Sequence, residues 1–422
     1  MMKKVIFHVD VNSAFLSWEA VFRLKYLGAK VDLREIPSAI GGDMSKRHGI
    51  ILAKSTPAKK YNIKTGEPVS DALKKCKDLY LAPPNYNLYE KCSKAFMEIL
   101  REYTPIVEQY SIDEAFMDLS SVIGEDGDPV KLANDIRERI YRELGFTVNI
   151  GVSDVKLLAK MASDFKKPNR VHTLFKKEIQ KKMWPLPVSD LFFVGRATTK
   201  KLYNLGITTI GQLATSDINI LRYHLKKQGE IVYNFANGID DSDVIKEPPK
   251  NKGYGNSTTI AFDVEDAQTA KKVILGLCET VGRRLRQDNV KAQVISVGIK
   301  SFDLKYASHQ LTIPNATNTT NEIYKYACQV FDELWDGTPI RHIGVQTSHV
   351  KEADECVSQM ELFDNNNYEK WEKVDKTMDE LREKFGIDVV KRATFVESPI
   401  DHMSGGISRE KRTVDYSKID IE

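Results

Sequence analysis

The sequence predicts an α+β protein built of several domains, and three observations lead to this prediction. The chain has 422 residues, of which 41% are apolar, and this length is typical of about three domains. Strand-like and helix-like segments alternate in two separate stretches. Between these stretches lies the sequence KEPPKNKG at 246–253, whose consecutive prolines and charges favour an extended linker.

The first stretch begins with a strand at Val5–Val9, which ends at Asp10. Beyond it the spacing of apolar residues predicts, in order, a helix at 13–25, a glycine-rich turn at 40–43, a helix at 87–103, a hairpin at 107–120, a helix at 129–144, a strand at 146–153 and a helix at 154–165. The order strand–helix–strand–strand–helix–strand resembles a ferredoxin-like sheet with an insertion after its first strand.

The second stretch follows a mostly helical region at 175–245. The pattern predicts, in order, strand 254–264, helix 267–287, strand 292–302, strand 307–313, helix 320–335 and strand 340–350. We expect a second helix-covered sheet of about 100 residues. The remainder, 351–422, is polar, with one predicted helix at 368–385.

Charge is unevenly distributed along the chain. Residues 351–422 carry 12 basic and 18 acidic residues, a net charge of −6, so residues 1–350 carry +9 of the total of +3. A basic body suits a polyanion such as nucleic acid. No apolar run approaches the ~20 residues that span a bilayer. The five cysteines are scattered and form no metal or disulfide pattern, so a cytoplasmic protein with no membrane partner is expected.

Three carboxylates form the candidate catalytic site. Asp10 ends the first strand, and Asp113–Glu114 lie at the apex of the hairpin, beside that strand in the predicted sheet. Converging carboxylates repel one another unless a cation lies among them, and oxygen ligands alone select Mg²⁺ or Mn²⁺. Two such ions catalyse phosphoryl transfer. The alternative is a solvated acidic turn, which is common at hairpin tips.

Longer motifs carry a resemblance. The strings DVNSAFLSWE (10–19), SIDEAFMDLS (111–120) and SDVKLLAKMASDFKKPN (153–169) resemble the bacterial Y-family DNA polymerases of the DNA polymerase IV and UmuC type. The resemblance implies translesion synthesis by a right-hand polymerase. Its implied domains are a ferredoxin-like palm at 1–13 and 84–174, small fingers at 14–83, a helix–hairpin–helix thumb at 175–245, a linker at 246–252, an α/β little finger at 253–350 and an acidic tail at 351–422.

The resemblance also implies residue roles. Asp10, Asp113 and Glu114 become the catalytic ligands of two Mg²⁺ ions, with Mn²⁺ as a substitute, and Val11 adds its backbone carbonyl. The backbone amides of Asn12, Ser13 and Ala14 would lie near the triphosphate of a deoxynucleotide, where a helix N-terminus favours an anion. Phe15 would be a steric gate that excludes a 2′-hydroxyl, with a place in the core as the alternative.

Other positions in the nucleotide site match the family or depart from it. Lys167 matches the lysine that meets the β- and γ-phosphates, whereas periodicity assigns Lys160 to a solvated face. Thr56 and Lys59 stand where many relatives carry a Tyr and an Arg, and Lys59 keeps the charge without bidentate geometry. Val155 stands where many relatives have Asn, a change with no physical explanation in the sequence.

Two segments predict macromolecular partners. Val194, Gly195 and Arg196 form the turn of a helix–hairpin–helix that would bind the DNA backbone, although Phe193 replaces the usual Gly. Gln359, Leu362 and Phe363 lie in QMELF, which resembles the peptide that binds the bacterial sliding clamp. The alternative is that Leu362 and Phe363 hold the next helix on the body.

The leading hypothesis is a monomeric, cytoplasmic and nucleoid-associated polymerase acting on primer–template DNA. A catalytically idle DNA- or clamp-binding paralogue is the first alternative. A nucleotide cyclase is the second, since it also uses two metals on a ferredoxin-like sheet, but the turn Gly41-Gly42-Asp43 is not the cyclase signature.

Overall fold

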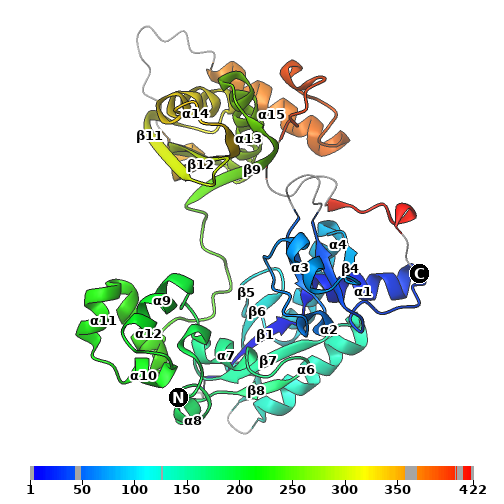
Figure 1. Cartoon of the computed structure of the whole chain (residues 1–422), viewed down its shortest axis with the longest axis vertical. Helices are drawn as coiled ribbons and strands as arrows, with labels where there is room; N and C mark the ends of the chain where they lie inside the picture. The colour runs from blue at the N-terminus through cyan, green and yellow to red at the C-terminus, as the bar shows by residue number, and fades with distance from the viewer. Residues whose placement is uncertain are drawn as a thin grey trace.

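The computed structural model describes residues 4–42, 49–124, 127–356, 368–403, 405 and 412–419. Three sheets and their surrounding helices make up this part of the chain, and the predicted α+β fold is confirmed. Figure 1 shows an N-terminal body in blue and cyan, a helical region in green, and a second α/β unit in yellow and orange. An extended segment joins the green region to the second unit.

The five-stranded sheet of the body has the order β5-β6-β1-β7-β8. Its strands are β1 (Ile6–Val11), β5 (Val107–Gln109), β6 (Glu114–Asp118), β7 (Val148–Ser153) and β8 (Val171–Thr173). β1 is buried throughout and pairs antiparallel with β6 on one side and β7 on the other. This is the ferredoxin-like order, with β8 added at the edge parallel to β7.

Alternation along β1 decides which side chains meet which helices. Phe7, Val9 and Val11 belong to the core cluster formed with the helices α4 (Tyr86–Tyr103) and α6 (Pro129–Leu144). Ile6, on the opposite face of the strand, packs instead with Ala159 of the helix α7 (Lys156–Ser163). Because side chains two residues apart point the same way, Asp10 shares the face that α7 covers.

The insertion after β1 forms a small separate sheet of order β3-β2-β4. Its elements are α1 (Ala14–Tyr26), β2 (Ser38–Gly41), β3 (Ile51–Lys54), α2 (Thr56–Lys59), α3 (Val69–Lys75) and β4 (Tyr80–Ala82). A short helix, α5 (Ser120–Ile123), follows β6 in the body.

The helical region shares a core with α7 of the body, whose Leu157, Leu158 and Met161 pack into it. Its helices are α8 (Ile179–Lys182), α9 (Arg196–Asn204), α10 (Ile210–Ala214), α11 (Ile218–Leu225) and α12 (Lys227–Ala236), with 3₁₀ turns at 176–178 and 188–190. The chain beyond α12 returns to the five-stranded sheet, where Val244 packs with Ile6 and Phe116.

The second unit is a four-stranded sheet of order β11-β10-β12-β9. Its elements are β9 (Gly253–Val264), α13 (Ala267–Gln287), β10 (Val290–Ser301), β11 (Tyr306–Thr317), α14 (Thr320–Leu334) and β12 (Ile340–Glu352). The helix α15 (Tyr368–Phe385) then packs on α13 and α14, so packing continues beyond the expected boundary at residue 350. Further 3₁₀ turns lie at 353–355, 393–395 and 416–418.

Candidate active site

Strand pairing brings the candidate carboxylates together. Asp10 in β1 lies directly opposite Glu114 in β6, and the backbone N–H of Val11 donates to the carbonyl of Asp113 over 3.0 Å. The hairpin apex therefore adjoins the end of the central strand. Two carboxylates so close in a partly buried place require positive charge nearby.

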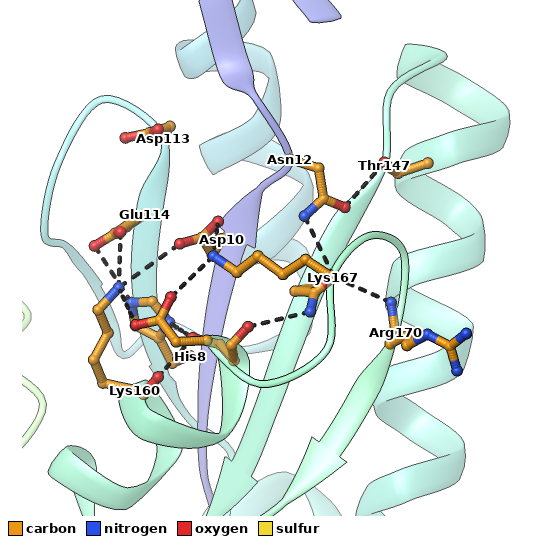
Figure 2. Close-up of polar contacts among 12 residues, drawn as sticks. His8, Asp10, Asn12, Asp113, Glu114, Thr147, Lys160, Lys167 and Arg170 are labelled. Carbon is orange, nitrogen blue, oxygen red and sulfur yellow. Dashed lines mark hydrogen bonds and ion pairs between the residues drawn. The ribbon is translucent and has the colours of Figure 1, made fainter. Parts of the chain in front are cut away.

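Two lysines supply that charge, as Figure 2 shows. The ammonium of Lys160, in α7, lies 2.8 Å from Glu114 Oε1 and 3.7 Å from Asp10 Oδ2. The ammonium of Lys167 lies 3.1 Å from Asp10 Oδ1. Asp164 contacts both lysines, at 3.4 Å and 2.9 Å. The result is an alternating network of carboxylates and ammonium groups around Asp10.

The prediction that Lys160 lies on a solvated face is wrong. Lys160 is only 7% exposed, because α7 packs against both β7 and β1 and nearly the whole surface of this helix is buried. Polar residues mark the solvent side of a helix only where one of its faces reaches water. Here the surrounding carboxylates, not water, stabilise the ammonium of Lys160.

Asp113 is turned differently from the other two carboxylates. Its Oδ1 accepts a hydrogen bond from Ser111 Oγ over 2.7 Å, within the turn. In Figure 2 it lies at the top of the hairpin, with no dashed line to Asp10 or Glu114. Within the described residues, no three acidic, His or Cys side chains converge as a preformed metal cluster.

The pKa values of Asp10 and Glu114 are shifted in opposite directions. Burial raises the pKa of Asp10 to about 7, although Lys167 and Lys160 act in the opposite direction. Burial alone would also raise the pKa of Glu114, but bonding to His8 and the charge of Lys160 outweigh it and lower that pKa. Burial lowers the pKa of His8 to about 4, so its imidazole is neutral at physiological pH. Of the two acids, Asp10 is therefore the one that holds a proton more readily.

The donor set suits a hard divalent cation. It consists of carboxylate oxygens on neighbouring strands, which already hold ammonium groups in the positions where cations are needed. Such all-oxygen ligation is what Mg²⁺ and Mn²⁺ prefer.

Asn12 does not have the role predicted for its backbone amide. Its N–H donates to the carbonyl of Thr147 over 3.0 Å, so it is not free to meet a phosphate. Its side-chain oxygen accepts from Thr147 Oγ1 and from the backbone N–H of Asn169, over 3.0 Å and 2.9 Å. The Asn12 side chain thus holds the loop after Lys167 against the end of β1.

The next residues form the start of α1. Ser13 has a left-handed backbone (φ 48°), and α1 begins at Ala14. Their amides therefore stand at a helix N-terminus, where a phosphate is favoured. The ring of Phe15 stacks on Tyr89 of α4, with centroids 4.5 Å apart and planes 8° apart, and it stays partly exposed. It packs on the core while one part of it faces outward.

Thr56 and Lys59 lie at the two ends of the short helix α2, and both are exposed. Ser55 caps this helix by accepting a hydrogen bond from Ala58 N over 3.1 Å. Pro57 stands in its first turn, where its fixed φ fits a helix start. The helix thus presents one hydroxyl and one charge in place of the Tyr and Arg of many relatives.

The helix–hairpin–helix turn differs from its prediction. The left-handed residue is Phe193, with φ 71°, while Gly195 is extended at φ −82° and precedes α9. The tight backbone conformation expected of Gly195 therefore falls on Phe193, the position where relatives carry Gly. The Gln228 side chain donates to the carbonyl of Phe193 over 3.0 Å and holds the turn. A cavity of about 600 Å³ beside it is lined by Val194, Gly195 and Arg196, among others.

The structure also explains Val155 and reveals a residue that the sequence did not point to. Val155 is the N-cap of α7 but has no side chain able to cap it, and it packs in the core of the helical region. Asp240, from the segment after α12, accepts the N–H of Leu157 over 3.0 Å. An acceptor for this amide is what an N-cap Asn supplies. No local motif marks Asp240, because it lies 83 residues away.

The clamp-like residues Gln359, Leu362 and Phe363 lie outside the described residues. Among the residues that are described, none of the helices combines the length and apolar character needed to span a bilayer.

Comparison with known proteins decides the family. Residues 9–164 match the impB/mucB/samB family, residues 251–362 match its C-terminal domain, and residues 176–207 match the HHH motif of the IMS family. DNA polymerase IV of Clostridium acetobutylicum is 46% identical over 396 residues, which cover 94% of this chain and 99% of the relative. The chain belongs to the Y family of translesion DNA polymerases.

Further similarities agree with this family. This Y-family polymerase is 38% identical to DNA polymerase IV of Acetivibrio thermocellus over 94% of its length and 98% of the relative. It is 34% identical to DNA polymerase IV 1 of Bacillus subtilis, over 93% and 94% of the two chains. A solved Y-family DNA polymerase chimera has the same fold, with a TM-score of 0.70 and 23% identity, over 82% of this chain and 99% of the other. The chain is a DNA-directed DNA polymerase, and its family depends on divalent metal ions.

Proposed function

We propose that this polymerase adds deoxynucleotides to a primer 3′-hydroxyl past damaged template bases, with Asp10, Asp113 and Glu114 as its metal ligands. The single observation that carries this assignment is the pairing of Asp10 with Glu114 across β1 and β6, with the ammonium of Lys160 held between them. The five-stranded sheet is then the palm, the three-stranded sheet the fingers, α9–α12 the thumb and the four-stranded sheet the little finger.

The protein's own groups would prepare the reaction. Two Mg²⁺ ions, or Mn²⁺, bound by these carboxylates and the carbonyl of Val11 would activate the primer hydroxyl and neutralise the triphosphate during in-line displacement. Lys167, now on Asp10, would turn to the β- and γ-phosphates as a point charge.

The nucleotide would lie along the start of α1. The amides of Ser13 and Ala14 would face the triphosphate, and Phe15 would lie under the sugar and exclude a 2′-hydroxyl. Thr56 and Lys59 would approach the triphosphate from the fingers. With a lysine in place of an arginine, binding would rest on charge more than on paired hydrogen bonds.

Primer–template DNA would lie against the thumb turn Val194-Gly195-Arg196 and the little finger. Such backbone contacts carry no sequence information, as a polymerase requires. We propose that the chain acts as a monomer on the bacterial nucleoid, in the cytoplasm.

Primer extension with Mg²⁺ tests the proposal. Asp113→Ala should abolish extension and leave the affinity for primer–template DNA nearly unchanged, because the carboxylate serves the reaction rather than the DNA. Asp135→Ala, an exposed acid on α6, is the matched control and should extend normally. If the unmodified chain binds DNA but extends no primer on any template, it is the idle paralogue instead.

We also propose that Gln359, Leu362 and Phe363 bind the sliding clamp. Two apolar anchors and an amide suit a groove on a partner, and clamp binding would raise the local concentration of the polymerase at the primer end. Replacing Leu362 and Phe363 with Ala should abolish clamp-stimulated synthesis and leave basal synthesis intact. Undiminished stimulation would assign these side chains to holding α15 instead.

A further inference from the structure

The last described residues of the chain lie on the body, far in sequence from their contacts. Figure 1 draws this C-terminal segment in red beside α1, at the fingers and palm. Tyr416 Oη donates to Glu19 Oε2 over 3.0 Å, and it accepts from Asn85 Nδ2 over 3.0 Å. Glu19 belongs to α1, and Asn85 is the N-cap of α4. One hydroxyl thus joins two elements of the catalytic body to residue 416.

Further contacts hold the same segment on the body. The ring of Tyr416 lies 5.3 Å from the ring of Phe22, and the guanidinium of Arg23 lies 5.8 Å from its centroid. Thr413 Oγ1 accepts a hydrogen bond from Asn87 Nδ2 over 2.6 Å. The contact therefore combines aromatic, cation–π and hydrogen-bonded components.

The body carries a buried charge that the segment completes. Glu19 is fully buried, and its Oε1 accepts from Arg23 Nε over 2.7 Å. Its Oε2 accepts from Tyr416. An ionised carboxylate away from water needs partners for both oxygens, and losing one leaves a desolvation cost unmet. Tyr416 therefore supplies the hydrogen-bond partner of the second oxygen of Glu19.

The chain just before this segment belongs to the other unit. Phe395 and Ile400 are buried in the core of the little finger. At Gly405 an added Cβ would come within 2.6 Å of Leu277 in α13, so this residue lies directly on the little finger. Six residues lie between Gly405 and Arg412, so seven Cα-to-Cα steps limit their distance to ~25 Å.

We propose that residues 412–417 form a C-terminal strap, which docks on α1 and α4 through Tyr416 and tethers the little finger to the palm a second time. The linker at 246–252 is the first tether, and each tether alone would leave the little finger free to swing. Two connections restrict its positions, so it loses less conformational freedom when it closes on DNA. The consequence for DNA binding rests on the proposed polymerase function, but the docking itself does not.

Small-angle scattering of the DNA-free protein tests the docking. Tyr416→Ala, and a chain ending at Lys411, should both give a larger radius of gyration than the full chain. Tyr416→Phe keeps the ring contacts and loses the hydroxyl, so its radius should fall between. Tyr141→Ala, an exposed tyrosine on α6, is the matched control and should scatter like the full chain. Identical scattering from all of these proteins would overturn the strap.

Titration with primer–template DNA tests the consequence. The chain ending at Lys411 and Tyr416→Ala should bind DNA about 3- to 10-fold more weakly, while the single-turnover rate at saturating DNA stays the same. Tighter binding after removal of the strap would overturn the tether, because the segment would then compete with DNA. A failure of primer extension in every protein, with the scattering difference present, would instead remove the polymerase proposal and leave the docking intact.

Discussion

Lys160 and Lys167 occupy positions between acidic side chains that would otherwise repel one another. Lys160 is held by Glu114 over 2.8 Å, and Lys167 by Asp10 over 3.1 Å. Arriving divalent cations would take over the neutralising role of these ammonium groups, freeing Lys167 for phosphate. The lysines therefore keep the site assembled before any substrate binds.

This role predicts a metal-dependent stability effect at Lys160. Lys160→Met keeps the length of the side chain and removes its charge, so the unfolding free energy of the metal-free protein should fall by about 2–3 kcal/mol. Denaturant unfolding in a chelator measures it. With saturating Mg²⁺ the deficit should shrink, because the cation replaces the missing charge. A deficit of equal size in both conditions would mean that Lys160 acts only through packing.

Phe15 gives a prediction about sugar selection. Phe15→Ala should raise the ratio of ribonucleotide to deoxynucleotide incorporation by on the order of 100-fold, since the ring that would meet the 2′-hydroxyl is gone. Single-nucleotide incorporation kinetics measure this ratio. Tyr26→Ala, an exposed residue on the same helix, should leave it unchanged. Unchanged selection in Phe15→Ala would assign Phe15 to the core alone.

At the residue scale, the sequence predicted identities better than environments. Asp10 and Glu114 were found because they lie at a strand end and a hairpin apex, each within a string that resembles the family, and strand pairing places them together. Lys160 was misjudged because the carboxylates that surround it lie outside its helix. The periodicity of residues along one helix gives no information about such neighbours. The orientation of Asp113 depends on a hydrogen bond to Ser111, two residues away, and no pattern of polar residues encodes that choice.

At the scale of elements, α7 receives its N-cap from another part of the fold. Asp240 accepts the N–H of Leu157. Nearby, Lys156 contacts both Glu108 of β5, over 2.6 Å, and the carbonyl of Asp243. The end of the thumb is thereby fastened to the helix that carries Lys160. Capping and docking of the thumb are consequently one interaction.

This arrangement predicts a rescue. Asp240→Ala should lower the unfolding free energy by about 1 kcal/mol, the usual value of a lost cap. Val155→Asn restores a local cap, so the loss in the double variant Val155→Asn/Asp240→Ala should be smaller than in Asp240→Ala alone. Denaturant midpoints measure both, with Asp240→Asn as the control that keeps an acceptor. Additive losses, with no rescue, would show that Asp240 does not serve as the cap.

Helix and strand positions were largely predictable, and so was the ferredoxin-like strand order of the palm, while the strand order of the little finger was not. Helices 129–144, 267–287 and 368–385 have the predicted bounds, since each has a strong apolar periodicity. Both sheets have the same succession of strands and helices. In the palm the first strand is central, whereas in the little finger β9 is at the edge and β12 lies between it and β10. The strand order depends on how the crossover helices pack over long range, and local sequence patterns do not predict that packing.

A buried ionic cluster fastens α15 and the chain after it to the little finger. Glu279 of α13 is 2% exposed and bonds to Arg382 over 2.9 Å and to Arg392 over 2.7 Å. Burial alone would raise the pKa of Glu279, but a bond from His402 and the two guanidinium groups outweigh it and lower that pKa. A lowered pKa in the folded state stabilises the fold above the unfolded value of 4.5, and this stability is lost as the pH falls further.

The cluster therefore predicts a pH-dependent difference between two proteins. At pH 7, Glu279→Gln should unfold with about 3 kcal/mol less free energy than the unmodified chain. Below pH 4.5 this difference in unfolding free energy should narrow. The unfolded form of the unmodified chain then binds a proton at this carboxyl more readily than the folded form does, which favours unfolding. Thermal unfolding across this pH range measures the gap. A gap independent of pH would show that charge at Glu279 is not what holds α15.

At the scale of the whole molecule, the distribution of charge predicts how DNA binding responds to salt. Residues 1–350 carry a net charge of +9 and the remainder −6. If about six phosphates are neutralised, DNA affinity should fall roughly a thousandfold between ~50 and ~200 mM salt. Fluorescence anisotropy at several salt concentrations gives the slope. A flat response would mean that apolar contacts dominate.

The C-terminal part of the chain was the least predictable at this scale. Its polar, acidic composition predicted one helix at 368–385 and none of the observed contacts, in which α15 packs on α13 and α14 and Tyr416 docks on α1. The attachments are buried ion pairs and single hydroxyl contacts between residues up to 397 positions apart. A prediction from composition treats such charged residues as solvated, because composition carries no information about which distant residues pair with them.

The central position of β1 also constrains how this chain can be made. β1 is buried along its whole length between β6 and β7, whose residues are 114–118 and 148–153. On a ribosome that adds about 5–20 residues per second, an apolar strand carrying Asp10 would wait roughly 7 to 28 seconds for both neighbours. During that interval the nascent chain exposes two unpaired strand edges, a substrate for chaperones and a route to aggregation. The strand that carries Asp10 is thus synthesised before both of the strands that enclose it.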